Sequence, residues 1–257
     1  MNAFYQWLRS VGHGRPTRSG ESVLAVNYLF LRKAVGWVGT LLPVILLIAN
    51  PIALSIENSS CGWLPGSVSA YYYSPVRNIF VGALCALGLF LIAYVGYDLG
   101  DRLVTDAAGV FAVGVAFFPT TATVESPLSV TCQTVAQLST RDQVVGDIHA
   151  VSAALFFAFL AWMAIRFTNT DQPQPSPQKL LRNHIYKICA IVIIVCLAAL
   201  VITNFLPTSF TSVFPWRLLY EALAIFAFGV SWFVKGQTLI RALKDVPPQV
   251  AEPAAQH

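Results

Sequence analysis

Six long apolar runs, separated by short polar segments, constrain the fold of this chain more than any other feature. The runs cover residues 34–56, 78–97, 103–123, 148–165, 188–206 and 218–234, the third being weaker because Asp106 and three threonines lie near its ends. A helix needs about 20 mainly apolar residues to cross about 30 Å of hydrocarbon, and the runs are close to that length. They do not alternate as barrel strands do, so transmembrane helices, which satisfy their own backbone hydrogen bonds, are expected.

The expected fold class is all-α, a polytopic six-helix transmembrane bundle with both termini cytoplasmic. The six-span domain would cover residues 34–236, after a cytoplasmic or interfacial segment at 1–33 and before a flexible cytoplasmic tail at 237–257. Within the first segment, residues 22–31 form either a short interfacial helix or part of a tail. Only 11% of the residues are charged and 56% are apolar. This composition excludes a water-soluble globule, because soluble domains carry about 25% charged residues.

The basic residues are divided unequally between the two sides of the expected bundle. With the amino terminus inside, thirteen arginines and lysines lie on the cytoplasmic side, and only Arg77, Arg141 and Arg217 lie on the other. Membrane proteins concentrate Lys and Arg in cytoplasmic loops, so this asymmetry predicts a multi-pass protein of the plasma (inner) membrane with both ends in the cytoplasm. The net charge of +4 is spread between the apolar runs, so no nucleic-acid partner is expected.

The five cysteines fall into two groups once the spans are placed. Cys85, Cys189 and Cys196 lie inside expected helices and are interpreted as small apolar packing residues. Cys61 and Cys132 lie in two connections on the non-cytoplasmic, oxidising side, so a disulfide between them is predicted. The alternative, two unpaired thiols that share a face, stays open.

Rows of small residues predict where helices approach closely, because lipid provides no hydrophobic driving force between apolar helices. Two rows at four-residue spacing are expected to face the interior: Ala108, Ala112 and Ala116 on the third run, and Ala150, Ala154 and Ala158 on the fourth. Pro43 and Pro51 are expected to kink or interrupt the first run, because proline removes a helical hydrogen bond.

Ionisable residues inside a membrane span are candidates for function, because an isolated charge there is costly. On the sixth run, Glu221 shares one helical face with Arg217, Phe228, Ser231 and Lys235. This face should point into the bundle, where the Glu221 carboxylate needs a partner or a proton.

The partners of Glu221 are expected from segments that reach the same outer boundary. The candidate residues for an outward-facing ligand-binding cleft are Ser69, Tyr71 or Tyr72, Arg77, Asp147, His149 and Glu221. Two simpler interpretations stay open: the tyrosines of SVSAYYYSPVRN form an aromatic belt at headgroup depth, and Arg77 forms a purely structural ion pair with Glu221. At the inner boundary an ion-paired rim, in preference to a second site, is expected from Asp98, Asp101, Arg182, Asn183, Tyr186 and Lys235.

The sequence carries no recognisable motif for a metal or a cofactor, and neither is expected. It has four histidines, of which His149 and His184 fall at opposite membrane faces and cannot share one ion. P-loop, dinucleotide and haem-attachment patterns do not occur. A serine nucleophile with His149 as its base lacks the sequence pattern of a nucleophile elbow.

Several segments resemble those of a group of uncharacterised bacterial integral membrane proteins, distantly similar to the six-span DRAM and Sfk-like membrane proteins. They are SVSAYYYSPVRNIFVGALCALGLFLIAYVGYD, AGVFAVGVAFFPT, HAVSAALFF, RNHIY and EALAIFAFGVSWFVKG. The resemblance covers most of the chain from residue 34 to residue 236, and it implies six helices with both ends cytoplasmic. It supplies no agreed reaction, so no catalytic residue is carried over.

Together these features favour a non-enzymatic protein that binds or passes a lipid headgroup or small polar solute at its outer mouth, or that belongs to a membrane complex. The expected partners are membrane lipids and, in a complex, another membrane protein. The alternative is a lipid-directed hydrolase or transferase in which His149 is the general base. An enzyme should place His149 beside a hydroxyl or water in an open cleft, whereas a scaffold would bury it against backbone carbonyls.

Overall fold

Helices account for all regular structure in the part of the chain that the computed structural model describes, which is residues 18–57, 62–96, 98–121, 140–168, 177–203, 205–206 and 214–236. In chain order they are α2 (Arg18–Ile56), the short 3-10 helix η1 (Ser69–Tyr73), α3 (Arg77–Ile92), α4 (Leu99–Phe117), α5 (Thr140–Arg166), α6 (Pro177–Thr203) and α8 (Trp216–Lys235). The all-helical fold class is therefore confirmed for the described residues.

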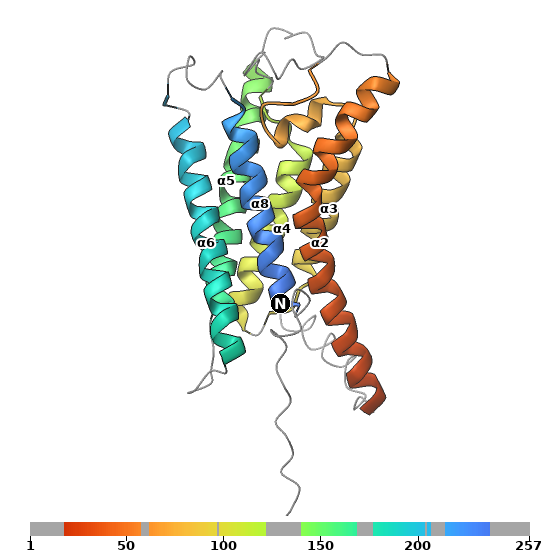
Figure 1. Ribbon diagram of the computed structural model, residues 1–257, viewed down its shortest axis with the longest axis vertical. Coiled ribbons are helices and arrows are strands. Elements are labelled where there is room, and N and C mark those ends of the chain that lie inside the picture. Colours follow the sequence, from red (N-terminus) through yellow and green to blue (C-terminus); the bar gives the residue numbers. More distant parts are fainter. Residues whose placement is uncertain are drawn as a thin grey trace, which may run out of the picture.

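The long helices alternate in direction and form a bundle (Figure 1). We call the end where α2 begins and α8 ends the lower end, and the end that carries η1 the upper end. Helices that are consecutive in the chain are neighbours in the bundle, and α8 closes the ring by packing against both α6 and α2. A smaller contact joins α5 to α8. Residues far apart in sequence, at the start of α8 and in η1, thus meet at the upper end.

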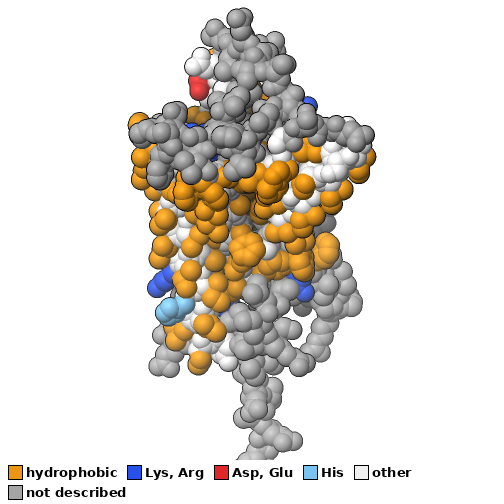
Figure 2. All heavy atoms as spheres, turned by 45° about the horizontal axis from the view of Figure 1, so that its top comes forward, with side chains coloured by type: hydrophobic (Ala, Val, Ile, Leu, Met, Phe, Trp, Pro, Cys, Tyr) orange, Lys and Arg blue, Asp and Glu red, His pale blue; other side chains and the backbone are white. Residues whose placement is uncertain are grey.

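Four of the described helices contain segments long and apolar enough to cross a membrane: Phe30–Ile56, Gln143–Arg166, Pro177–Thr203 and Trp216–Lys235. The outer surface agrees with this, since apolar side chains make up most of the described surface that is visible in Figure 2. These features indicate a membrane protein. The other two long helices differ: α3 has only 16 residues, and α4 carries three charged residues, Asp101, Arg102 and Asp106, in its first half.

The helix boundaries differ from the sequence prediction between the second and third runs. Helix α3 ends at Ile92, five residues before the predicted end, and α4 begins at Leu99, four residues before the predicted start. The reason is a cap: the Asp98 side chain accepts a hydrogen bond of 2.7 Å from the Asp101 N–H, which satisfies a free amide at the start of α4. The upper end of α4 is also shorter than predicted, because Phe118 is already extended.

Both prolines of the first run lie within one continuous helix. Helix α2 has 39 residues and includes Pro43 and Pro51, so the two prolines do not interrupt the helix, and a kink at either of them stays a prediction. Near Pro51, the Ser55 hydroxyl donates a hydrogen bond of 2.8 Å to the Pro51 carbonyl. Residues 22–31 belong to the same helix, which excludes the alternative of a non-helical tail there.

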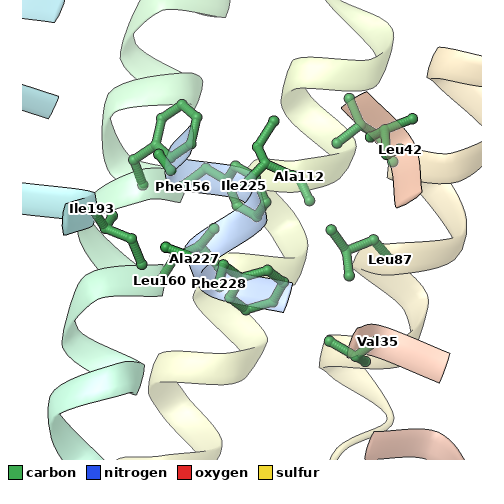
Figure 3. Packing of buried hydrophobic residues seen from close by; sticks show 14 of the residues in the cluster. Val35, Leu42, Leu87, Ala112, Phe156, Leu160, Ile193, Ile225, Ala227 and Phe228 are labelled. Atoms are coloured by element: carbon green, nitrogen blue, oxygen red, sulfur yellow. The ribbon is translucent and has the colours of Figure 1, made fainter. Parts of the chain in front are cut away.

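The core is centred on α8. Figure 3 shows its residues Ile225, Ala227 and Phe228 lying between side chains of the surrounding helices, and Phe228 and Trp232 are fully buried. The α8 face predicted to point inward does so at Phe228 and Ser231, the latter being only 1% exposed. Helices α2 and α8 approach each other closely, because each has a glycine, Gly39 and Gly229, at their crossing.

Only one of the two predicted small-residue rows faces the interior. Ala108, Ala112 and Ala116 on α4 are buried, as predicted. The row on α5, by contrast, is exposed at Ala150, Ala154 and Ala158, so that prediction is wrong. The physical reason is that α5 turns its large side chains inward, among them Phe156 and Leu160 (Figure 3), and the small residues are left at the edge of that face.

The described cysteines are unpaired and lie in helices, with Cys189 and Cys196 buried and Cys85 half-buried. This agrees with their interpretation as packing residues. Cys61 and Cys132 lie outside the described residues, so the predicted disulfide between them stays a prediction.

Candidate functional site

A cavity of about 190 Å³ lies at the upper end of the bundle. A water molecule takes up about 30 Å³ in the liquid, so the cavity has room for a small polar group. Its polar lining is formed by Ser67, Ser69, Tyr73, Thr120, Thr121, His149, Arg217 and Glu221, and its apolar lining by Ala150, Ala153, Ala154, Phe157, Leu197, Leu200 and Val201. These residues come from η1 and the segment before it, the end of α4, and helices α5, α6 and α8.

The first two turns of α8 place a positive and a negative charge in this cavity. Arg217 and Glu221 are four residues apart, hence on one helical face, and both are half-buried. The start of α8 is held by a hydrogen bond of 3.0 Å from the Leu218 N–H to the Gly66 carbonyl. Because this bond satisfies one of the free amides of the first turn, it fixes α8 against the segment that leads into η1.

The Glu221 carboxylate is bound by the first residue of η1. Its Oε2 accepts hydrogen bonds from the Ser69 backbone N–H at 3.0 Å and from the Ser69 hydroxyl at 3.3 Å. The preceding turn is held by Ser67, whose Oγ accepts from the Ala70 N–H at 3.0 Å. Glu221 therefore contributes a hydrogen-bonded carboxylate at a fixed place in the cavity wall.

His149 lines the cavity but is only 4% exposed. Its Nδ1 lies 2.6 Å from the Phe118 carbonyl oxygen. Since a carbonyl can only accept, Nδ1 carries the proton and donates it to this bond. The contact joins α5 to the extended segment after α4, and the Tyr73 hydroxyl donates to the Thr120 carbonyl of the same segment at 2.5 Å.

Three of the residues predicted for the site meet in the cavity: Ser69, His149 and Glu221. The other three do not line it. Arg77 is exposed and lies over the Tyr72 ring, with 4.0 Å between its guanidinium carbon and the ring centroid, and it also donates a hydrogen bond to the Tyr72 hydroxyl. Asp147 is exposed on α5. The interpretation of Arg77 as the ion-pair partner of Glu221 is replaced by these two separate contacts.

The sequence prediction missed several polar residues of the cavity, including Arg217, Tyr73, Thr120 and Thr121. Arg217 had a usable signal, because it lies one helical turn before Glu221 on the predicted inward face. The two threonines follow the end of α4 directly. They had no such signal, because their position in the cavity depends on how the chain turns after Phe118.

Within the described residues, no group of three or more His, Cys, Asp or Glu side chains is placed to hold a metal ion. The described cavity wall has one carboxylate, that of Glu221, and one imidazole, that of His149. The groups in this wall can form hydrogen bonds and charge pairs.

The lower end of the bundle carries the predicted rim of ionisable residues, but some of these residues pair with a residue that was not predicted. Arg166, at the end of α5, forms salt bridges with Asp98, at 2.6 Å, and with Asp101. Tyr186 and Arg182 are buried, and a hydrogen-bonded ion-paired rim is present at Asp98 and Asp101. The partner of the two carboxylates is an arginine that the sequence prediction did not include in the rim.

Acid should weaken this lower rim. The Asp101 N–H, together with Arg166, holds the pKa of Asp98 below its ordinary value of 3.8. A carboxyl whose folded-state pKa is lowered stabilises the fold above its unfolded pKa, and the contribution is lost as the pH falls through the folded pKa. We expect the difference in melting temperature between the wild type and Asp98→Asn to be constant near neutral pH and to shrink below pH 3.8. A difference that grows in acid would contradict this.

Comparison with family models, curated proteins and solved structures finds no match to this chain. The similarity to the DRAM and Sfk-like proteins therefore stays a prediction, and function is argued from the residues of the upper cavity.

Proposed function

We propose that this protein is a six-span plasma (inner) membrane protein whose upper cavity faces the outside and binds the polar headgroup of a lipid or a small polar solute. In this proposal α3 and α4 complete the set of spans, since they lie in the same ring as the four long apolar helices. The protein acts by binding or passing this ligand, alone or with a membrane-protein partner, and both termini lie in the cytoplasm.

The distribution of basic residues supports this orientation. The lower half of the bundle contains the described cationic residues Arg32, Lys33, Arg102, Arg166, Lys179, Arg182, Lys187 and Lys235. Arg77 and Arg217, by contrast, begin helices at the upper end. Because cationic residues collect on the cytoplasmic side, the lower end is assigned to the cytoplasm.

The observation that carries the proposed binding function is the pair of opposite charges in one cavity. Arg217 suits an anionic group such as a phosphate, and Glu221 suits an ammonium group. A zwitterionic headgroup carries one group suited to each of them, while the hydroxyls of Ser67 and Thr121 in the same wall offer further hydrogen bonds.

The contact of the Ser69 hydroxyl favours binding over catalysis. A hydrolase or transferase would need the imidazole beside a hydroxyl nucleophile. Here the Ser69 hydroxyl is bonded to the Glu221 carboxylate. His149 is bonded through Nδ1 to the Phe118 carbonyl, which orients the ring and leaves Nε2 as the nitrogen that could accept a proton. The alternative with His149 as general base therefore has no support from Ser69.

The test is the affinity of the purified full chain for glycerophosphoethanolamine, a soluble zwitterionic headgroup, measured by calorimetry. Glu221→Gln removes the charge but keeps an oxygen that can accept from Ser69, and it should weaken binding by about tenfold or more, as expected for a lost charged hydrogen bond. The matched control is Asp147→Asn, which removes the same charge at an exposed position outside the cavity. Equal affinities for Glu221→Gln and the wild type, or no binding by the wild type, would contradict the proposal.

A further inference from the structure

We infer that the upper cavity opens sideways into the bilayer between α5 and α6, and that its ligand is a lipid whose alkyl chain lies in this opening. The inference rests on the proposed binding function, and it goes further by naming the class of ligand and its path. Three observations carry it: the depth of the cavity, the exposure of its edge, and the separation of polar from apolar lining.

The cavity reaches deep into the bundle. On α5 its lining continues from His149 to Phe157, which is about 12 Å along the helix axis at 1.5 Å per residue. Ala154, within this stretch, is eleven residues inside the apolar segment Gln143–Arg166, or about 16 Å from its upper end. That depth is close to the middle of the 24-residue segment. If α5 spans the membrane, the surroundings of Ala154 are hydrocarbon.

The edge of the cavity is exposed on both helices that border it, near the middle of α5 and close to the upper end of α6. Ala150 and Ala154 on α5 line the cavity and are exposed, although the α5 side chains that face the core are buried. On α6, Val201 also lines the cavity and is 50% exposed.

The exposed surfaces of the two helices continue directly from this edge. Val151, next to Ala150, is 59% exposed. On α6, Ile194 and Ile202 are 48% and 56% exposed. The cavity lining thus merges with the apolar outer surfaces of α5 and α6. A lateral opening between these helices accounts for this, and the small side chains of Ala150 and Ala154 leave it wide.

The polar and apolar parts of the lining are separated along the bundle axis. The charged groups come from the first two turns of α8, and Thr120 follows the upper end of α4. The deeper wall is apolar and includes Phe157 and Leu197. A wholly polar solute would leave this wall unmatched, whereas a lipid has its headgroup at the depth of Arg217 and its chain at the depth of Phe157. This matches the order of groups in a bilayer leaflet.

The test uses the full chain in nanodiscs of phosphatidylcholine that contain a phosphatidylethanolamine with a photoactivatable group in its acyl chain. After illumination, mass spectrometry should locate the crosslinks on α5 and α6 near Ala154 and Val201. Ala154→Trp, which fills the opening, should reduce this crosslinking at least tenfold. The matched control, Ala158→Trp, adds the same side chain one turn further along α5, at an exposed residue that does not line the cavity, and it should behave as the wild type.

A second variant and a second ligand keep the test decisive. Val201→Trp narrows the opening from α6 and should act like Ala154→Trp. Both variants should keep the size-exclusion profile and the melting temperature of the wild type, which shows that they are folded. Soluble glycerophosphoethanolamine, which needs no lateral path, is measured with the wild type only. Crosslinks at other helices, unchanged crosslinking in Ala154→Trp, or equal affinity of the wild type for the soluble headgroup and the lipid would overturn the inference. The proposed binding function would survive those results, and it fails separately if the wild type does not bind soluble glycerophosphoethanolamine.

Discussion

Leucine in place of Gly229 is expected to disrupt the packing of α2 against α8 and to lower the stability of the folded protein. A Cβ atom at Gly229 would lie 2.5 Å from the Thr40 backbone nitrogen and 2.9 Å from the Gly39 carbonyl carbon. Backbone atoms cannot rotate away as a flexible side chain can, so the two helices would have to separate. Overpacking a well-packed core costs about 1–3 kcal/mol, and a forced helix separation belongs at the upper end of that range.

The consequence extends beyond one contact because α8 contributes several of the most deeply buried side chains of the core. Phe228, next to Gly229, is fully buried, and Trp232 is buried one turn further on. Moving α8 away from α2 would open both positions. It would also shift the first turns of α8, which carry Arg217 and Glu221 into the upper cavity.

The matched control is Gly82→Leu on α3. A Cβ at Gly82 has no neighbouring atom within 4 Å, so the same exchange adds no clash there. It also removes a residue that is unfavourable in a helix interior by about 1 kcal/mol. We expect fluorescence-detected size-exclusion chromatography in detergent to give a lower melting temperature for Gly229→Leu and an unchanged or higher one for Gly82→Leu. Equal melting temperatures in the two variants would show that the α2–α8 crossing can adapt.

The sequence predicted the parts of the fold that depend on hydrophobicity along one helix. The apolar runs correspond to the helices, and the inward face of α8 followed from the spacing of Phe228 and Ser231, which are both buried. Such predictions succeed because a helix has a fixed period. The residues that share one face therefore follow from the sequence, even when the neighbouring helix is not known.

Predictions that needed the identity of a neighbouring helix were less successful. The α4 and α5 alanine rows have the same spacing, yet Ala112 is buried and Ala154 is exposed. The four-residue spacing shows that the alanines of a row lie on one face of their helix. It does not show whether this face or another face of the same helix packs against a neighbouring helix. On α5 the large side chains, such as Phe156, occupy the interior.

The candidate site shows the same limit. Glu221 and His149 were predictable as polar residues in apolar surroundings, which require partners. The partners themselves, Ser69 for one and the Phe118 carbonyl for the other, come from non-adjacent segments. Arg77, at a suitable depth, instead lies over the ring of Tyr72, which is part of η1 and five residues earlier in the chain. Depth in the membrane follows from the sequence, whereas position around the bundle axis does not.

The second large effect is expected at the lower end, where Arg166→Gln should destabilise the protein by about 1–3 kcal/mol. The Arg166 guanidinium joins the end of α5 to the start of α4 through Asp98 and Asp101. The side chains of Arg166 and Asp101 are only 20% and 15% exposed. Water therefore compensates poorly for the lost positive charge. The substitution also leaves two neighbouring carboxylates, those of Asp98 and Asp101, without the guanidinium that bridged them.

The control for this prediction is an arginine in an exposed ion pair at the same end. Arg102 lies 3.7 Å from Asp106, with side-chain exposures of 55% and 36%. Exposed pairs of this kind contribute about 0–1 kcal/mol, so Arg102→Gln should change the melting temperature little. Similar losses for Arg166→Gln and Arg102→Gln would contradict the special role of the α4–α5 bridge.

A double variant separates the lost attraction from the repulsion that remains. In Arg166→Gln, Asp98 and Asp101 face each other as like charges, which is unfavourable at short range. Adding Asp101→Asn removes that repulsion, so it should recover part of the melting temperature lost by Arg166→Gln. In the wild-type background Asp101→Asn should be destabilising instead, because it breaks the bridge to Arg166. This reversal of sign is the specific result expected if the two carboxylates share one guanidinium.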